Sequence, residues 1–200
     1  MPGAEAGATR LTRGRLLWAG AGAAAGAVAI ATGRDDGTPL AAPSKATDVE
    51  ILRFFLTLEQ VQEAFYRDAL ESGRLDGELL ELATAVRGQE REHVAFLTER
   101  LGGRAKPPPR SDFGDAFESP ERFRRTAVEL EEAAIAGYIG QAAHLGGRLI
   151  GAVATMLSVE ARQVAWLRDL EGISPAPKAA DPARSADDVL ASLREKGFVA

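Results

Sequence analysis

Two motifs with the same spacing contain the side chains best suited to chemistry. Glu90 and His93 form a Glu-x-x-His motif, and Glu160 and Gln163 repeat its spacing 70 positions later. The sequence has no cysteine, which excludes disulfides, zinc–thiolate sites, iron–sulfur clusters and thiol nucleophiles. It has only two histidines. Any metal site must therefore rely mainly on carboxylates, which suit iron, manganese or calcium better than zinc.

Two further acids, Glu59 and Glu131, lie on the apolar stripes of predicted helices. Each is followed seven residues later by a tyrosine, Tyr66 or Tyr138. Side chains seven positions apart lie on one face of a helix. The sequence therefore predicts two similar helix pairs, offset by about 70 residues.

The four acids fall near the midpoints of four predicted helices. Those midpoints lie near positions 59, 89, 131 and 159, and the acids are Glu59, Glu90, Glu131 and Glu160. In an antiparallel bundle all four carboxylates then lie at one level. Four ionised carboxylates in a core are prohibitively costly unless something neutralises them. Either cations neutralise them, for which a bridged pair of divalent metal ions is the economical solution, or protons and arginines do.

Helix start and stop signals define the elements that position these acids. The capping box Thr47-Asp48-Val49-Glu50 opens the first helix, and Ser119-Pro120-Glu121 opens the third. Pro107-Pro108-Pro109 cannot be helical and lies in a long crossover. The predicted helices span about residues 47–71, 78–101, 119–142, 148–171 and, after a proline-rich loop, 185–196.

These acids and motifs resemble the ferritin-like family of di-iron four-helix bundles, in which two helices each supply a Glu and the other two each supply Glu-x-x-His. Within that family the chain is similar to the bacterial and plant group related to desiccation-associated proteins. The resemblance covers about residues 47–171. It implies an all-α, ferritin-like antiparallel four-helix bundle with one long crossover and a short C-terminal helix. The phrases that carry it are Leu58-Glu59 through Phe65-Tyr66, Glu90-Arg91-Glu92-His93-Val94, Leu130-Glu131 through Gly137-Tyr138, and Val159-Glu160-Ala161-Arg162.

The resemblance also implies which residues hold metal. The ligands carried over by position are Glu59, Glu90, His93, Glu131 and Glu160. Gln163 stands where the family has a second histidine, and it is a weak or lost ligand because an amide carbonyl binds iron less well than imidazole does. The expected cofactor is iron, as two ions or as one because of Gln163, with manganese as the alternative metal. Tyr66 and Tyr138 are expected beside the site, as core residues with hydrogen-bonded hydroxyls or with a redox role.

Two functions are compatible with these features. The first is a metal-binding protein with a carboxylate-rich iron or manganese site and ferroxidase-like or peroxide-type redox chemistry. The alternative is a non-enzymatic bundle with a structural, stress-protective or envelope-interaction role. In that alternative His93 is a packed core residue, and the buried acids pair with Arg87 or Arg162. The fold alone does not decide whether the protein is an enzyme.

The first 31 residues have the order of an export signal. Arg10, Arg13 and Arg15 precede a charge-free run rich in Ala and Gly, and Ala29-Ile30-Ala31 supplies a small-x-small cleavage site. One glycine interrupts the similarity to a twin-arginine signal, so the twin-arginine route and the general secretory route both stay open. We expect the mature chain in the periplasm, the cell envelope or the extracellular space.

The predicted organisation has four parts. They are an export signal at 1–31, a linker at 32–46, the ferritin-like bundle at 47–171 and a proline-rich tail with a short helix at 172–200. The net charge is −5 and no basic stripe is present, so nucleic acid is not an expected partner. Metal ions are the expected partners, and a membrane is expected only through an uncleaved signal segment. The sequence does not specify the oligomeric state.

Overall fold

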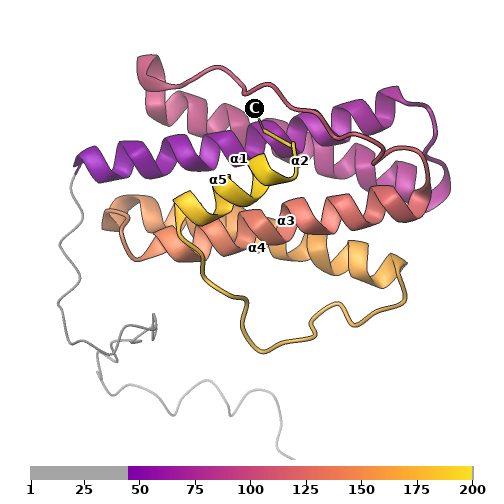
Figure 1. Cartoon of the computed structure of the whole chain (residues 1–200). Coiled ribbons are helices and arrows are strands. Elements are labelled where there is room, and N and C mark those ends of the chain that lie inside the picture. Colours follow the sequence, from indigo (N-terminus) through magenta and orange to yellow (C-terminus); the bar gives the residue numbers. More distant parts are fainter. Residues whose placement is uncertain (1–44, 200) are drawn as a thin grey trace, which may run out of the picture. The chain divides into compact units, whose positions relative to one another are not determined.

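The computed structural model describes residues 45–199, and within that range every regular element is a helix (Figure 1). This confirms the predicted all-α fold. The export signal predicted for residues 1–31, and most of the linker predicted for residues 32–46, lie outside the described residues. The elements are α1 (Lys45–Glu71), α2 (Gly77–Leu101), the short 3-10 helix η2 (Gly102–Arg104), α3 (Pro120–Ala142), α4 (Gly147–Leu170) and α5 (Ala186–Glu195).

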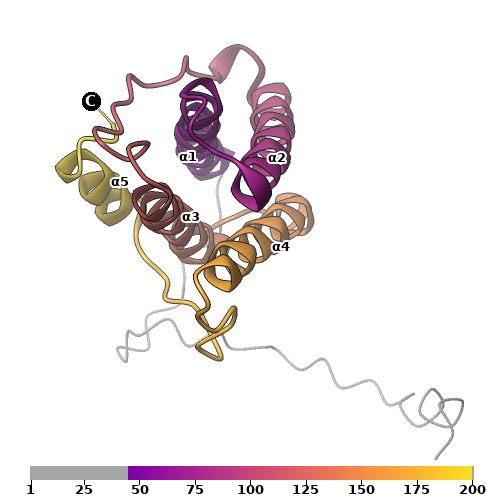
Figure 2. The ribbon, with the colours of Figure 1, turned by 90° about the vertical axis from the view of Figure 1, so that its right-hand side faces the viewer.

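Helices α1 to α4 form a four-helix bundle in which neighbouring helices are antiparallel. α1 packs against α2, and α3 packs against α4, so the bundle consists of two helix hairpins. In the view along the bundle, α1 lies next to α3 and α2 lies next to α4 (Figure 2). A long crossover leads from η2 back along the bundle to α3 (Figure 1). This topology is the one expected for a ferritin-like bundle.

An aromatic cluster fixes the crossover to the bundle. Phe65 of α1 stacks on Phe123 of α3 with their ring centroids 5.4 Å apart. Phe113 and Phe117 of the crossover each lie 5.2 Å from the Phe65 ring, measured between centroids. Phe113 also contacts Phe198 near the C-terminus, at 5.9 Å. Since aromatic rings bury large apolar areas, this cluster holds the crossover and the C-terminal segment on the same part of the bundle.

Serine caps begin α3, as the sequence predicts, and α5. The hydroxyl of Ser119 accepts a hydrogen bond from the amide of Arg122 at 3.3 Å, and that of Ser185 accepts one from the amide of Asp188 at 3.1 Å. Among residues 45–199, no helix is both long enough and apolar enough to cross a membrane.

The start of α1 differs from the prediction. The helix begins at Lys45, ahead of the predicted capping box. Asp48 of that box accepts a hydrogen bond at 2.8 Å from the amide of Gly146, in the turn before α4. Asp48 therefore joins the N-terminal turn of α1 to that of α4, a contact between residues far apart in the sequence.

The C-terminal segment covers α3 through one close backbone contact. The amide of Arg184 donates a hydrogen bond to the carbonyl of Ala136 at 2.9 Å. At this contact a Cβ on Gly140 would lie only 1.9 Å from the carbonyl oxygen of Arg184, so the close approach depends on glycine. The apolar side chains that the segment buries are Val189, Leu193, Phe198 and Val199.

Candidate metal centre

Each helix of the bundle supplies one glutamate that is 0% exposed. These are Glu59 of α1, Glu90 of α2, Glu131 of α3 and Glu160 of α4. They share polar partners in the centre of the bundle, as described below. The structure therefore brings together the four acids that the sequence places at helix midpoints.

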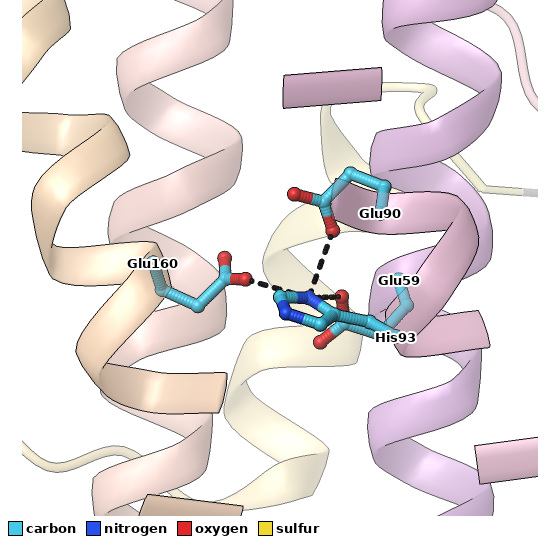
Figure 3. A group of neighbouring side chains, drawn as sticks. All are labelled: Glu59, Glu90, His93 and Glu160. Carbon is cyan, nitrogen blue, oxygen red and sulfur yellow. Dashed lines mark hydrogen bonds and ion pairs between the residues drawn. The ribbon is translucent and has the colours of Figure 1, made fainter. Parts of the chain in front are cut away.

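The ring of His93, also on α2, lies among three of these carboxylates (Figure 3). Its Nδ1 atom is 3.0 Å from Oε2 of Glu59, 3.2 Å from Oε1 of Glu160 and 3.5 Å from Oε2 of Glu90. Each of the four residues offers one ligand atom, and these atoms lie within 4.8 Å of one another. One divalent ion could contact all four side chains after small rotations.

Two carboxylate oxygens beside His93 indicate whether the four side chains fit a metal ion. Oε2 of Glu90 and Oε1 of Glu160 are buried and have no hydrogen-bond donor. Buried acceptors without a partner are rare in native proteins because leaving them unsatisfied is costly. A cation at this place would satisfy both oxygens. Three carboxylates and one imidazole are a donor set suited to iron or manganese, so the residues fit such an ion.

Glu131 is not one of the three acids around His93 and has different partners. Its Oε2 atom accepts a hydrogen bond from Nε2 of Gln62, and the same amide donates to Oε2 of Glu160 at 2.9 Å. Gln62 is 1% exposed and was not among the predicted site residues. The signal for it is its position, three residues after Glu59 on the inner stripe of α1, which is the spacing of Glu-x-x-His.

Gln163 faces the cluster with its amide nitrogen. Nε2 of Gln163 donates to Oε1 of Glu90 at 2.8 Å and to Oε1 of Gln89 at 3.0 Å. A carboxamide that donates through its nitrogen presents no ligand atom in that direction. The residue that replaces the second histidine is therefore a hydrogen-bond donor to one of the acids.

The two predicted tyrosines are both fully buried and hydrogen-bonded to acids. The hydroxyl of Tyr66, on α1, donates to Oε1 of Glu131, on α3, at 2.6 Å. The hydroxyl of Tyr138, on α3, donates to Oε1 of Glu59, on α1. The two helices thus exchange tyrosine–glutamate contacts. Burial raises the pKa of both tyrosines well above the usual value, so both hydroxyls stay protonated donors.

Burial and mutual repulsion also perturb the acids and the imidazole. Burial, followed by the charge of Glu160, raises the pKa of Glu90 and of Glu131 well above the usual range. Burial raises the pKa of Glu160 as well. Burial alone would lower the pKa of His93, but the three surrounding carboxylates outweigh it and raise that pKa from 6.5 to about 12. Without a metal ion, these shifts favour the protonated forms of Glu90, Glu131, Glu160 and His93.

The arginines considered as partners of the acids lie elsewhere. Nε of Arg87 is 3.3 Å from Oε1 of Glu63 at the rim of the bundle, and Arg162 donates to the hydroxyl of Ser158 at 3.1 Å. Every ion pair that the described residues form with the four buried acids involves His93. The second histidine, His144, lies in the turn between α3 and α4.

Comparison with known proteins agrees with this architecture. No curated protein matches the chain significantly. The family model described as the ferritin-like domain matches residues 47–172, which include α2, α3, α4 and all but the first two residues of α1. That match is to the domain as a whole and does not distinguish the desiccation-related group within it. With its four-helix bundle and its central cluster of buried glutamates, the chain belongs to the ferritin-like domain family.

Proposed function

We propose that this protein binds a divalent metal ion through Glu59, Glu90, His93 and Glu160. The observation that carries the proposal is the pair of buried carboxylate oxygens, on Glu90 and Glu160, that have no donor and face Nδ1 of His93. Iron or manganese is the metal that we expect, because the donor set consists of carboxylate and imidazole.

A bound iron or manganese ion would supply one-electron redox chemistry at this place. The protein holds the three carboxylates away from solvent, since their side chains are 0% exposed, whereas the side chain of His93 is 10% exposed. The edge of His93 is therefore where small molecules would reach the ion. Tyr138 fixes one oxygen of Glu59 through its hydroxyl and leaves the other oxygen directed at the site. More specifically, we propose ferroxidase-like or peroxide-type activity at the bound ion.

Metal content of the purified full chain tests the proposal. We expect iron or manganese to remain bound after dialysis without chelator, measured by mass spectrometry of the elements. Glu90→Gln removes one ligand and should weaken binding at least tenfold. Glu92→Gln is the matched control, because Glu92 lies on the same helix but is exposed, and it should bind as the wild type does. Absence of bound metal in the wild type, even at excess metal, would refute the proposal.

The alternative is a metal-free bundle with a structural, stress-protective or envelope-interaction role. The glutamine amides favour it, because Gln62 and Gln163 satisfy part of the acid cluster without any ion. A chelator separates the two functions. It should lower the melting temperature of a metal-binding protein and leave that of a metal-free bundle unchanged.

We also propose that the chain is exported, which rests on the order of charges and apolar residues in residues 1–31. Cell fractionation with a C-terminal tag should recover a mature protein that begins near Thr32 outside the cytoplasm. Full-length protein confined to the cytosol of the native host would contradict this.

A further inference from the structure

We infer that the centre holds one metal ion per chain, because the carboxamides of Gln62 and Gln163 occupy the place of a second cation. The inference deepens the proposed function and rests on it. It follows from a comparison of the two helix hairpins and from the direction of each hydrogen bond in the cluster.

The two hairpins supply equivalent residues at most positions of the centre. Glu59 and Tyr66 of the first hairpin correspond to Glu131 and Tyr138 of the second, and Glu90 corresponds to Glu160. Two buried positions break the correspondence. The equivalents of Gln62 and His93 are Ala134 and Gln163.

Glu90 and Glu160 each direct one carboxylate oxygen to His93 and the other to a glutamine amide, so their oxygens line two different places in the cluster. Glu90 directs Oε2 to His93 and Oε1 to the amide of Gln163. Glu160 directs Oε1 to His93 and Oε2 to the amide of Gln62. One place is thus lined by oxygens beside an imidazole, and two of those oxygens lack a donor. The other place is lined by oxygens that already have amide donors.

The remaining acid, Glu131, lines the second place, where the carboxylate oxygens have amide donors. Glu131 accepts from Gln62 through Oε2 and from Tyr66 through Oε1, so both of its oxygens are satisfied. A second ion would have to rotate both carboxamides away from the acids, which also breaks the contact between Gln163 and Gln89. The second ion would gain no imidazole ligand in return. The donors in place therefore favour one ion over two. The carbonyl oxygens of Gln62 and Gln163, which are buried without a donor, would become ligands only if both amides turned.

The hairpin comparison itself specifies the variants that test this inference. Gln62→Ala copies Ala134, and Gln163→His copies His93. The double variant should bind two ions per chain where the wild type binds one, as measured by anaerobic titration of the full chain with Mn²⁺. The matched control is Gln60→Ala, which removes the same group from the rim of α1, where Gln60 donates to the carbonyl of Lys106. It should bind one ion.

Electron paramagnetic resonance supplies a second readout. A single Mn²⁺ gives the hyperfine spectrum of an isolated ion, whereas two ions that share carboxylates couple magnetically. We expect the isolated spectrum in the wild type and the coupled one in the double variant. Circular dichroism checks folding, and Gln62→Leu, which also removes the donor, replaces Gln62→Ala if the smaller side chain prevents folding.

The outcomes separate this inference from the proposed function. A wild type that binds no ion refutes the proposed function and the inference with it. A wild type that binds two coupled ions retains the proposed function and overturns the inference, because the amides then turn their oxygens toward the metal. A double variant that folds but still binds one ion also overturns it.

Discussion

Raising the pH should destabilise the metal-free protein over a range in which most proteins change little. The folded state holds a proton on His93 up to a pKa of about 12, because three buried carboxylates surround its ring. The unfolded chain releases that proton near pH 6.5. Between these values the folded state binds one more proton than the unfolded state. The free energy of unfolding therefore falls as the pH rises.

The size of the effect follows from linkage. One additional proton held by the folded state corresponds to a loss of about 1.4 kcal/mol of stability for each pH unit. From pH 7 to pH 9 the loss is about 3 kcal/mol, or roughly 6–12 °C in melting temperature for a chain of this size. Glu90 and Glu131 act in the same direction from about pH 4.5 upward, because their folded-state pKa values are also raised.

Urea unfolding at several pH values, in the presence of a chelator, measures this slope. The chain has only two histidines, which provide a matched pair of variants. His93→Gln should remove the share of the slope that comes from His93, about 1.4 kcal/mol for each pH unit between pH 7 and pH 9, whereas His144→Gln should leave the slope unchanged. A wild type whose stability is constant or rises across this range would refute the reasoning.

Three further predictions concern proton release, ligand support and packing. Metal binding at pH 7 should release at least one proton per ion, from His93 and from any ligand carboxyl that is protonated, so calorimetric heats should differ between buffers with different ionisation enthalpies, and equal heats would contradict this. Tyr138→Phe removes the donor that fixes a ligand and should weaken metal binding about 10- to 100-fold in titrations, while Tyr66→Phe, which touches an acid outside the ligand set, should not. Gly140→Ala should destabilise the fold by about 1–3 kcal/mol in urea unfolding because its Cβ meets backbone. The control Gly151→Ala, on an open helix face, should stabilise it by about 0.5–1 kcal/mol, and equal effects would contradict the packing argument.

Most of the fold and part of the centre could be predicted from the sequence. Helical periodicity and capping signals are local, so they place the helices and put four acids at one depth. The direction in which a side chain points within the core depends on contacts with other helices, which local sequence signals do not specify. The spacing of Gln62 after Glu59 indicates that its side chain faces inward, but no pattern within α1 indicates that its amide contacts acids on α3 and α4. The tyrosines were expected beside the site, but their exchange between α1 and α3 depends on how the hairpins pack.

The division into two hairpins has a consequence for how the protein folds. Contacts within a hairpin join residues that are close in the sequence and can form early, whereas docking of the hairpins closes a much longer loop. Tyr66 and Tyr138 meet their acids only at that docking step, as does Gln163. Docking therefore brings like charges together late in folding. Metal or protons should speed this step, so the refolding rate of the protein should depend on both.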